Sequence, residues 1–168
     1  GRTMDRDHDI SSWFWAREKT IKHLKERDYV FGFYQWAGVE HRGEAMWPMV
    51  CSKSGALDLF LYEKGAFWQN KSHFTTEPMV YIVPHWNFKG LEGETVAVTV
   101  YTNCDELELF VNGESIGKKT AEDHFFYFDV KNEGESTIVA KAGELTDEGI
   151  IRKVAERNMD YVLVEKGA

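Results

Sequence analysis

Two glutamates and a histidine lie close together in the sequence, at Glu40, His41 and Glu44. A pair of carboxylates can act as general acid and nucleophile when the two groups are held about 5–5.5 Å apart. A spacing of four residues in a loop does not fix that distance. We therefore expect these residues to lie on a solvated loop, where Glu40 or Glu44 could contact the hydroxyl groups of a bound substrate.

Trp36 is the strongest candidate for a binding residue. It ends the apolar run from Tyr29 to Trp36, and a polar, glycine-rich segment follows it. The flat face of an indole ring can stack on the C–H face of a sugar, which combines apolar burial with a defined geometry. The alternative is a tryptophan that only fills the core.

Other polar groups favour structural roles. His85, Trp86 and Asn87 follow Pro84, which typically ends or edges a strand. Residues 103–105 (Asn-Cys-Asp) read as a turn whose side chains bond the local backbone. The two cysteines, at positions 51 and 104, lack metal-type spacing and read as reduced thiols, with a disulfide as the alternative. The sequence predicts no metal site, and we find no Ser-His-Asp constellation or phosphate-binding loop.

The composition excludes several classes of partner. The chain has 168 residues, of which 43% are hydrophobic and 14% aromatic, enough for a packed core. Its net charge of −8, without a Lys/Arg cluster, disfavours nucleic acid and anionic membranes. No apolar run approaches the length of a membrane span. A neutral substrate such as a sugar is compatible with this charge.

The first part of the chain has mixed α/β patterning. The sequence predicts an amphipathic helix from Ser11 or Ser12 to about Arg27, with Glu18 mostly outside its apolar arc. Tyr29 to Trp36 is apolar on both alternating faces, which predicts a strand buried on both sides. A long loop follows, and then a second short helix from about Glu63 to Phe74.

Beyond residue 78 every segment reads as a β-strand. Glu106 to Val111 alternates strictly, which predicts that Leu107, Leu109 and Val111 face a core. Asn112-Gly113 follows directly and is a strong hairpin signal, since both residues tolerate positive φ. The remaining expected strands are 80–84, 96–101, 114–119, 125–130, 136–142 and 161–164. Their spacing indicates a β-sandwich.

Several of these motifs together resemble glycoside hydrolase family 2, in its β-galactosidase-like members. The motifs are Pro84-His85-Trp86-Asn87, residues 101–106 (YTNCDE), Glu108-Leu109-Phe110 and Asn112-Gly113, in that order. Upstream, Trp36, Gly43-Glu44 and Ser54-Gly55 resemble the end of the eighth barrel strand and its following loop. Glu40-His41 stands where the family commonly has an Asp-Tyr pair, so the resemblance does not define the sugar.

The resemblance implies a mainly β chain made of two parts. Residues 1–75 would be the last α/β unit of a (β/α)8 barrel, and residues 76–168 an immunoglobulin-like β-sandwich. The intact protein would be a retaining β-glycosidase whose two catalytic glutamates lie upstream of this chain. Its partners would be a carbohydrate substrate and the rest of the barrel, with no cofactor. Trp36 would form a wall of the sugar subsite, and the chain alone would be inactive.

Two questions stay open at this point. A non-catalytic carbohydrate-binding or adhesion module is the main alternative to a glycosidase, and the expected buried strand 29–36 argues against it because such a module would not need that strand. The cellular compartment is not indicated, since both a cytoplasmic and a secreted protein are compatible with the sequence.

Overall fold

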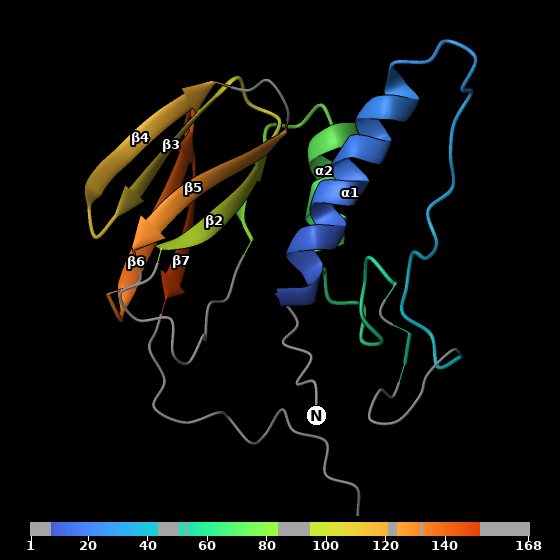
Figure 1. Cartoon of the computed structure of the whole chain (residues 1–168), viewed down its shortest axis with the longest axis horizontal. Coiled ribbons are helices and arrows are strands. Elements are labelled where there is room, and N and C mark those ends of the chain that lie inside the picture. The colour runs from blue at the N-terminus through green and yellow to red at the C-terminus, as the bar shows by residue number, and fades with distance from the viewer. Residues whose placement is uncertain are drawn as a thin grey trace, which may run out of the picture.

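The computed structural model describes residues 8–43, 51–52, 54–83, 95–120, 124–131 and 133–151. Within these ranges two helices precede seven strands (Figure 1). The helices are α1 (His8–Lys25) and α2 (Gly65–Phe74). The strands are β1 (Val80–Ile82), β2 (Thr95–Thr102), β3 (Glu106–Val111), β4 (Glu114–Thr120), β5 (Phe125–Lys131), β6 (Ser136–Ala142) and β7 (Leu145–Ile151).

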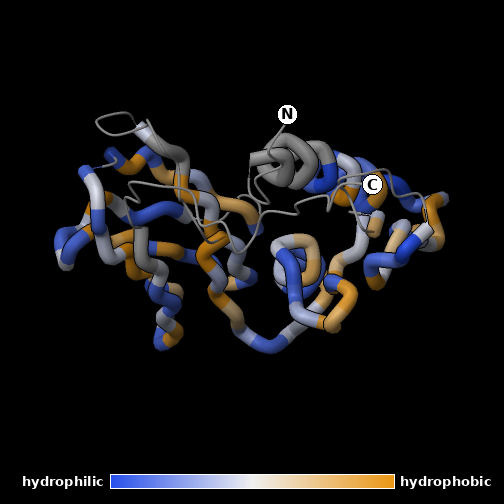
Figure 2. The backbone as a smooth tube through the Cα atoms, turned by 90° about the horizontal axis from the view of Figure 1, so that it is seen from below, coloured by the Kyte–Doolittle hydropathy of each residue, from blue (hydrophilic) through white to orange (hydrophobic). Residues whose placement is uncertain are grey.

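The strands form two antiparallel sheets that pack face to face. One sheet has the order β1-β2-β5 and the other the order β4-β3-β6-β7. Hydrophobic and hydrophilic residues alternate at short intervals along the chain (Figure 2). In β3, β5 and β6 buried positions alternate with more exposed ones, as half-buried strands require. The core between the sheets consists of Ile82, Val98, Val100, Leu107, Leu109, Phe126, Phe128, Val130, Ile138, Ala140 and Ala142. The chain is mainly β, and the predicted sandwich is confirmed.

Strand β3 and its hairpin follow the sequence pattern closely. Leu107 and Leu109 are fully buried, and Val111 packs against the same core while partly exposed. Asn112 and Gly113 have φ values of 52° and 84°, so both turn residues adopt the left-handed conformation that a two-residue type I′ hairpin needs. The predicted inward face and the predicted turn are therefore both confirmed.

Strand β7 was not predicted from the sequence. Its central residues Thr146, Asp147, Glu148 and Gly149 show no apolar alternation. The strand forms because it pairs in register with β6, from Ala142 opposite Leu145 to Ser136 opposite Ile151. Asp147 also crosses to the other sheet, where its Oδ2 accepts a hydrogen bond of 2.7 Å from the amide of Ile82. The strand expected at residues 161–164 lies outside the described residues.

The prediction of a buried strand from Tyr29 to Trp36 is wrong for this chain. The segment is extended but pairs with no strand of the described residues, and the side chains of Tyr29, Phe31 and Tyr34 are exposed. An apolar run of this kind becomes a buried strand only when neighbouring strands supply hydrogen bonds and cover both faces. The described part of the chain supplies neither.

Helix α2 lies against the outer face of the β1-β2-β5 sheet, and α1 packs beside α2 (Figure 1). Trp68 of α2 stacks on Tyr81 of β1, with ring centroids 4.5 Å apart and planes inclined by 9°. Met79 and Tyr101 are buried at the same seam. A second, smaller hydrophobic core thus lies between α2 and the outer face of this sheet and joins the helix to the sandwich.

Two polar side chains differ from their predicted roles. Asn103 bonds distant rather than local backbone: its Oδ1 accepts from the amide of Met79 at 2.8 Å, and its Nδ2 donates to the carbonyl oxygens of Thr75 and Glu77. Glu18 was expected outside the apolar arc of α1 but is buried, because Gln69 Nε2 donates to its Oε2 at 3.1 Å and His73 Nε2 lies 2.8 Å from the same oxygen.

Candidate functional site

The candidate site lies on a loop in which residues 37–40 pair along the backbone with residues 54–57. We call these two segments the first and second arms of the loop. The Ala37 amide donates to Ser54 O at 3.0 Å, and the Leu57 amide donates to Gly38 O at 2.9 Å. The Ala56 amide returns a hydrogen bond to Ala37 O at 3.1 Å. The peptide bond between Trp36 and Ala37 is cis. This pairing starts directly after Trp36 and therefore fixes where the chain leaves that residue.

Gly55 allows the two arms to approach so closely. A Cβ atom at this position would lie 2.5 Å from Leu57 O and 2.6 Å from the carbonyl carbon of Val39, and closer still to the amide nitrogen of Glu40. All three are backbone atoms, which cannot rotate away as a side chain can. No other residue fits at position 55 without separating the arms.

We expect Gly55→Ala to open this loop. Overpacking of a closely packed site costs about 1–3 kcal/mol. The change should appear as faster hydrogen exchange at the amides of Ala56 and Leu57, which make the pairing bonds. Gly38→Ala is the matched control, because a Cβ at Gly38 meets no atom within 4 Å. Equal exchange in the two variants would contradict the close approach described for Gly55.

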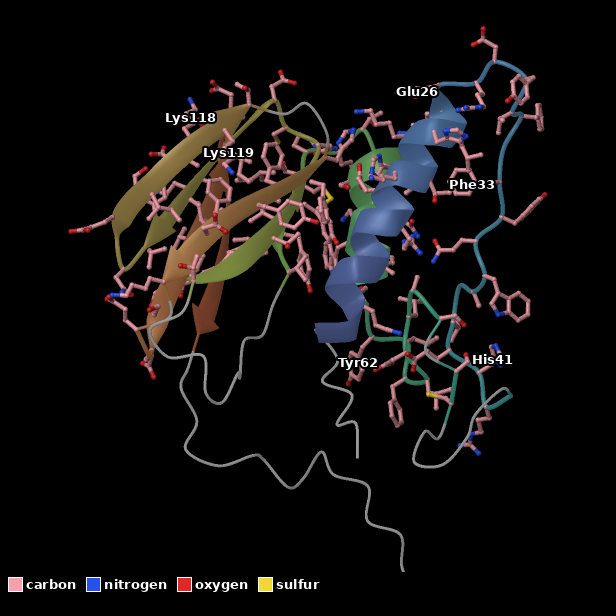
Figure 3. The ribbon with its side chains drawn as sticks, viewed as in Figure 1. Glu26, Phe33, His41, Tyr62, Lys118 and Lys119 are labelled. Atoms are coloured by element: carbon pink, nitrogen blue, oxygen red, sulfur yellow. The ribbon has the colours of Figure 1, made fainter. Side chains whose placement is uncertain are left out.

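The second arm returns to α2 through a turn built on Asp58. This buried carboxylate accepts hydrogen bonds from the amides of Phe60 and Tyr62, at 2.8 and 3.0 Å. The amide of Lys64 then donates to Ala56 O at 3.0 Å, immediately before α2 begins. The turn therefore connects the loop rigidly to the helix. Figure 3 shows Tyr62 of this turn and His41, directly after the first arm, in the same region of the molecule.

Trp36 presents an open aromatic face in this loop. Its side chain is 70% exposed, and the imidazole of His41 meets it edge to face, with ring centroids 5.6 Å apart and planes inclined by 75°. The two predicted site residues are thus in contact. An exposed indole held by a second ring is suited to stacking on an apolar face of a ligand.

Glu40 is held in a different set of contacts. Its Oε1 forms an ion pair with Lys64, and its Oε2 accepts a hydrogen bond of 3.2 Å from the thiol of Cys51. Burial, followed by the hydrogen bond to Glu40, raises the pKa of Cys51, so this thiol stays protonated. Cys51 and Cys104 are both free thiols, as predicted. The carboxylate of Glu40 is therefore engaged by two neighbours in this structure.

The structure brings together only part of the predicted site. Trp36 and His41 are adjacent, while the Glu40 carboxylate contacts Lys64 and Cys51 instead. Glu44 lies outside the described residues, as do His85, Trp86 and Asn87. Lys64 was missed because 24 residues separate it from Glu40, and no local pattern signals that pair.

The described ranges show neither a metal-binding cluster nor a helix that could span a membrane. No three His, Cys, Asp or Glu side chains gather there in a way that could hold a metal ion. Neither helix combines the length and the apolar character that crossing a membrane requires.

Comparison with known proteins identifies related sequences and structures. Residues 93–146 match the family described as Domain of unknown function (DUF4982). The chain is 33% identical over 111 residues to the β-galactosidase BoGH2A of Bacteroides ovatus, and 34% identical over 101 residues to a putative β-glucuronidase of Formosa agariphila. These matches cover 64% and 56% of this chain but only 13% and 10% of the two relatives.

A solved structure extends the match to the three-dimensional fold. The β-glycosidase of Bacteroides vulgatus superposes with a TM-score of 0.72 at 30% sequence identity. The superposition covers 83% of this chain and 18% of that one. The sandwich and these matches support the resemblance to a C-terminal part of a glycoside hydrolase family 2 protein, of which the chain spans only a part.

Proposed function

We propose that the intact protein carrying this chain is a retaining β-glycosidase and that Trp36 forms a wall of its sugar subsite. The observation that carries the proposal is the open face of Trp36, held by His41 on a rigid loop. Its relatives are named for β-galactoside and β-glucuronide hydrolysis, and these are the two substrate classes we propose. His41 lies beside Trp36, and Glu40 and Glu44 would contact the rim of the site.

The exposed apolar side chains support a barrel as the partner of residues 1–75. Phe31 and Tyr34 on the extended segment, and Phe60 and Leu61 on the loop, are all exposed. Surfaces of this kind are typical of protein interfaces. We propose that the remaining strands of a (β/α)8 barrel cover them and that residues 29–36 then become its last strand. Residues 76–168 would form the supporting sandwich domain.

The alternative of a free-standing sugar-binding module has less support. A module would require only the sandwich, whereas the match to the β-glycosidase of Bacteroides vulgatus covers 83% of this chain. The seam between α2 and β1, built on Trp68 and Tyr81, is equally hard to explain in a module that ends at the sandwich.

The test is hydrolysis by the full-length protein of three chromogenic substrates: a β-galactoside, a β-glucuronide and a β-glucoside. We expect turnover of the β-galactoside or the β-glucuronide, with the β-anomer released first, as a covalent glycosyl-enzyme requires. Release of the α-anomer would exclude the retaining mechanism. If none of the three substrates is hydrolysed by a correctly folded protein, the proposed function is wrong.

Within that enzyme we expect Trp36→Ala to lower kcat/KM by an amount worth about 1–3 kcal/mol, the range for one binding contact. The reason is that stacking strengthens as the sugar ring flattens toward the transition state. Trp36→Phe is the matched control, because it keeps an aromatic face and should retain most of the activity. Unchanged kinetics in a folded Trp36→Ala variant would assign Trp36 a purely structural role.

A further inference from the structure

Arg17 of α1 joins three side chains from two other parts of the chain. Its Nη2 donates to Gln35 Oε1 and to Asn70 Oδ1, both at 2.7 Å, and its Nε donates to Gln69 Oε1 at 3.0 Å. Asn70 Nδ2 closes the arrangement by donating to Gln35 Oε1 at 2.9 Å. Gln35 is therefore held at one oxygen by both helices.

Gln35 directly precedes Trp36, and the backbone around it has few other attachments. The nearest backbone hydrogen bonds of the described residues flank the segment, from Val30 to Arg27 O and from Ala37 to Ser54 O. Between them, the contacts with the helices among the described side chains are those of Gln35, through its amide, and of Phe33, which meets Phe74 with ring centroids 6.0 Å apart. Figure 3 shows Phe33 on this extended segment alongside α1.

The amide orientations in this cluster are fixed by chemistry. A guanidinium group can only donate, so the atoms that face Arg17 must be the amide oxygens of Gln35, Gln69 and Asn70. Gln69 is fully buried, and its Nε2 donates to Glu18 Oε2 at 3.1 Å. The three amide oxygens thus form a preorganised set of acceptors. The planar guanidinium group of Arg17 donates to all of them at once, which a lysine ammonium cannot do in this geometry.

We propose that Arg17 is a positioning residue for the sugar site: by holding Gln35 against α1 and α2, it fixes the place and tilt of Trp36. This inference rests on the proposed function of Trp36. Arg17 itself touches no substrate. Its effect on binding passes through one peptide bond, from the clamped Gln35 to the indole that stacks on the sugar.

The test in the full-length enzyme is a double-mutant cycle on Arg17 and Gln35. Arg17→Met and Gln35→Met should each lower kcat/KM by about 10- to 100-fold, because small displacements of a binding group have effects of that order. The double variant should lose no more than the larger single effect, since both changes break one connection. Arg17→Lys keeps the positive charge but lacks the planar guanidinium group, so its kcat/KM should stay close to that of Arg17→Met. Lys19→Met, an exposed basic side chain on the same helix, is the control and should match the wild type.

Hydrogen exchange of the chain gives a readout that does not depend on activity. The amide of Ala37, which directly follows Trp36 and donates to Ser54 O, should exchange about 10-fold faster in Gln35→Met than in Lys19→Met, while the amides of β3 and β6 stay unchanged. If Trp36→Ala impairs the enzyme but the Arg17 and Gln35 variants do not, the inference fails and the proposed function stands. Unchanged exchange at the amide of Ala37 also overturns the inference. If the wild-type enzyme is inactive, the proposed function fails, and Arg17 can then only be a structural clamp.

Discussion

Leu109→Ala is expected to lower the free energy of unfolding of the sandwich by about 2–5 kcal/mol. Leu109 lies in β3 between β4 and β6, opposite Gly117 on one side and Ala140 on the other. Its side chain has 0% exposure and belongs to the core between the sheets. Truncation removes apolar contacts, and the small residues at both neighbouring positions cannot expand to fill the cavity.

The measurement is urea denaturation followed by a probe of the sandwich, with Ile116→Ala as the control. Ile116 is also a branched aliphatic residue, but it is 41% exposed on β4, so its truncation should cost about 0.5 kcal/mol or less. Similar midpoints for the two variants would mean that the faces of β3 are reversed and that Phe110 is the inward residue.

The sandwich could be predicted because its signals are local. In β3 the period-two alternation reports directly which side chains are buried, and Asn112-Gly113 fixes the turn because few other residue pairs accept positive φ at both positions. Strand β7 could not be predicted, since Thr146 to Gly149 form a strand only through pairing with β6. This pairing depends on the neighbouring strand β6, and the hydropathy pattern of residues 146–149 does not indicate it.

The candidate site was predictable only where its residues are close in sequence. Trp36 and His41 are five residues apart on one loop, and the structure places their rings in contact. The partners of Glu40 and Gln35 lie on other elements, so no spacing indicates Lys64 or Arg17. The apolar pattern of residues 29–36 predicted a strand buried on both sides, which the described chain does not form, because a hydropathy pattern does not show whether the covering elements belong to the same chain.

The second large effect concerns catalysis: the isolated 168-residue chain is expected to have no glycosidase activity. Retaining hydrolysis needs an acid and a nucleophile about 5–5.5 Å apart on opposite sides of the glycosidic bond. Both must be rigidly held, since small misplacements cost about 100-fold in rate. Glu40 is engaged by Lys64 and Cys51, and Glu44 lies on the same loop in the sequence, so a pair facing each other across a barrel is not expected from this segment.

The same reasoning predicts how the chain would behave in solution. The exposed Phe31, Tyr34 and Phe60 should cause self-association or should bind an apolar fluorescent dye, whereas the full-length protein should do neither at these residues. This difference separates a chain that is inactive because it lacks its barrel from one that is simply unfolded, since the sandwich would keep its protected amides.

The measurement that tests the account most directly compares the purified chain with the full-length protein on the same chromogenic β-galactoside and β-glucuronide. We predict turnover by the full-length protein, reduced by Trp36→Ala, and no turnover by the chain above the rate without protein. Turnover by the chain itself, lost in Glu40→Gln or Glu44→Gln, would contradict the account, because it would place the catalytic carboxylates on the loop that we assign to the rim of the site.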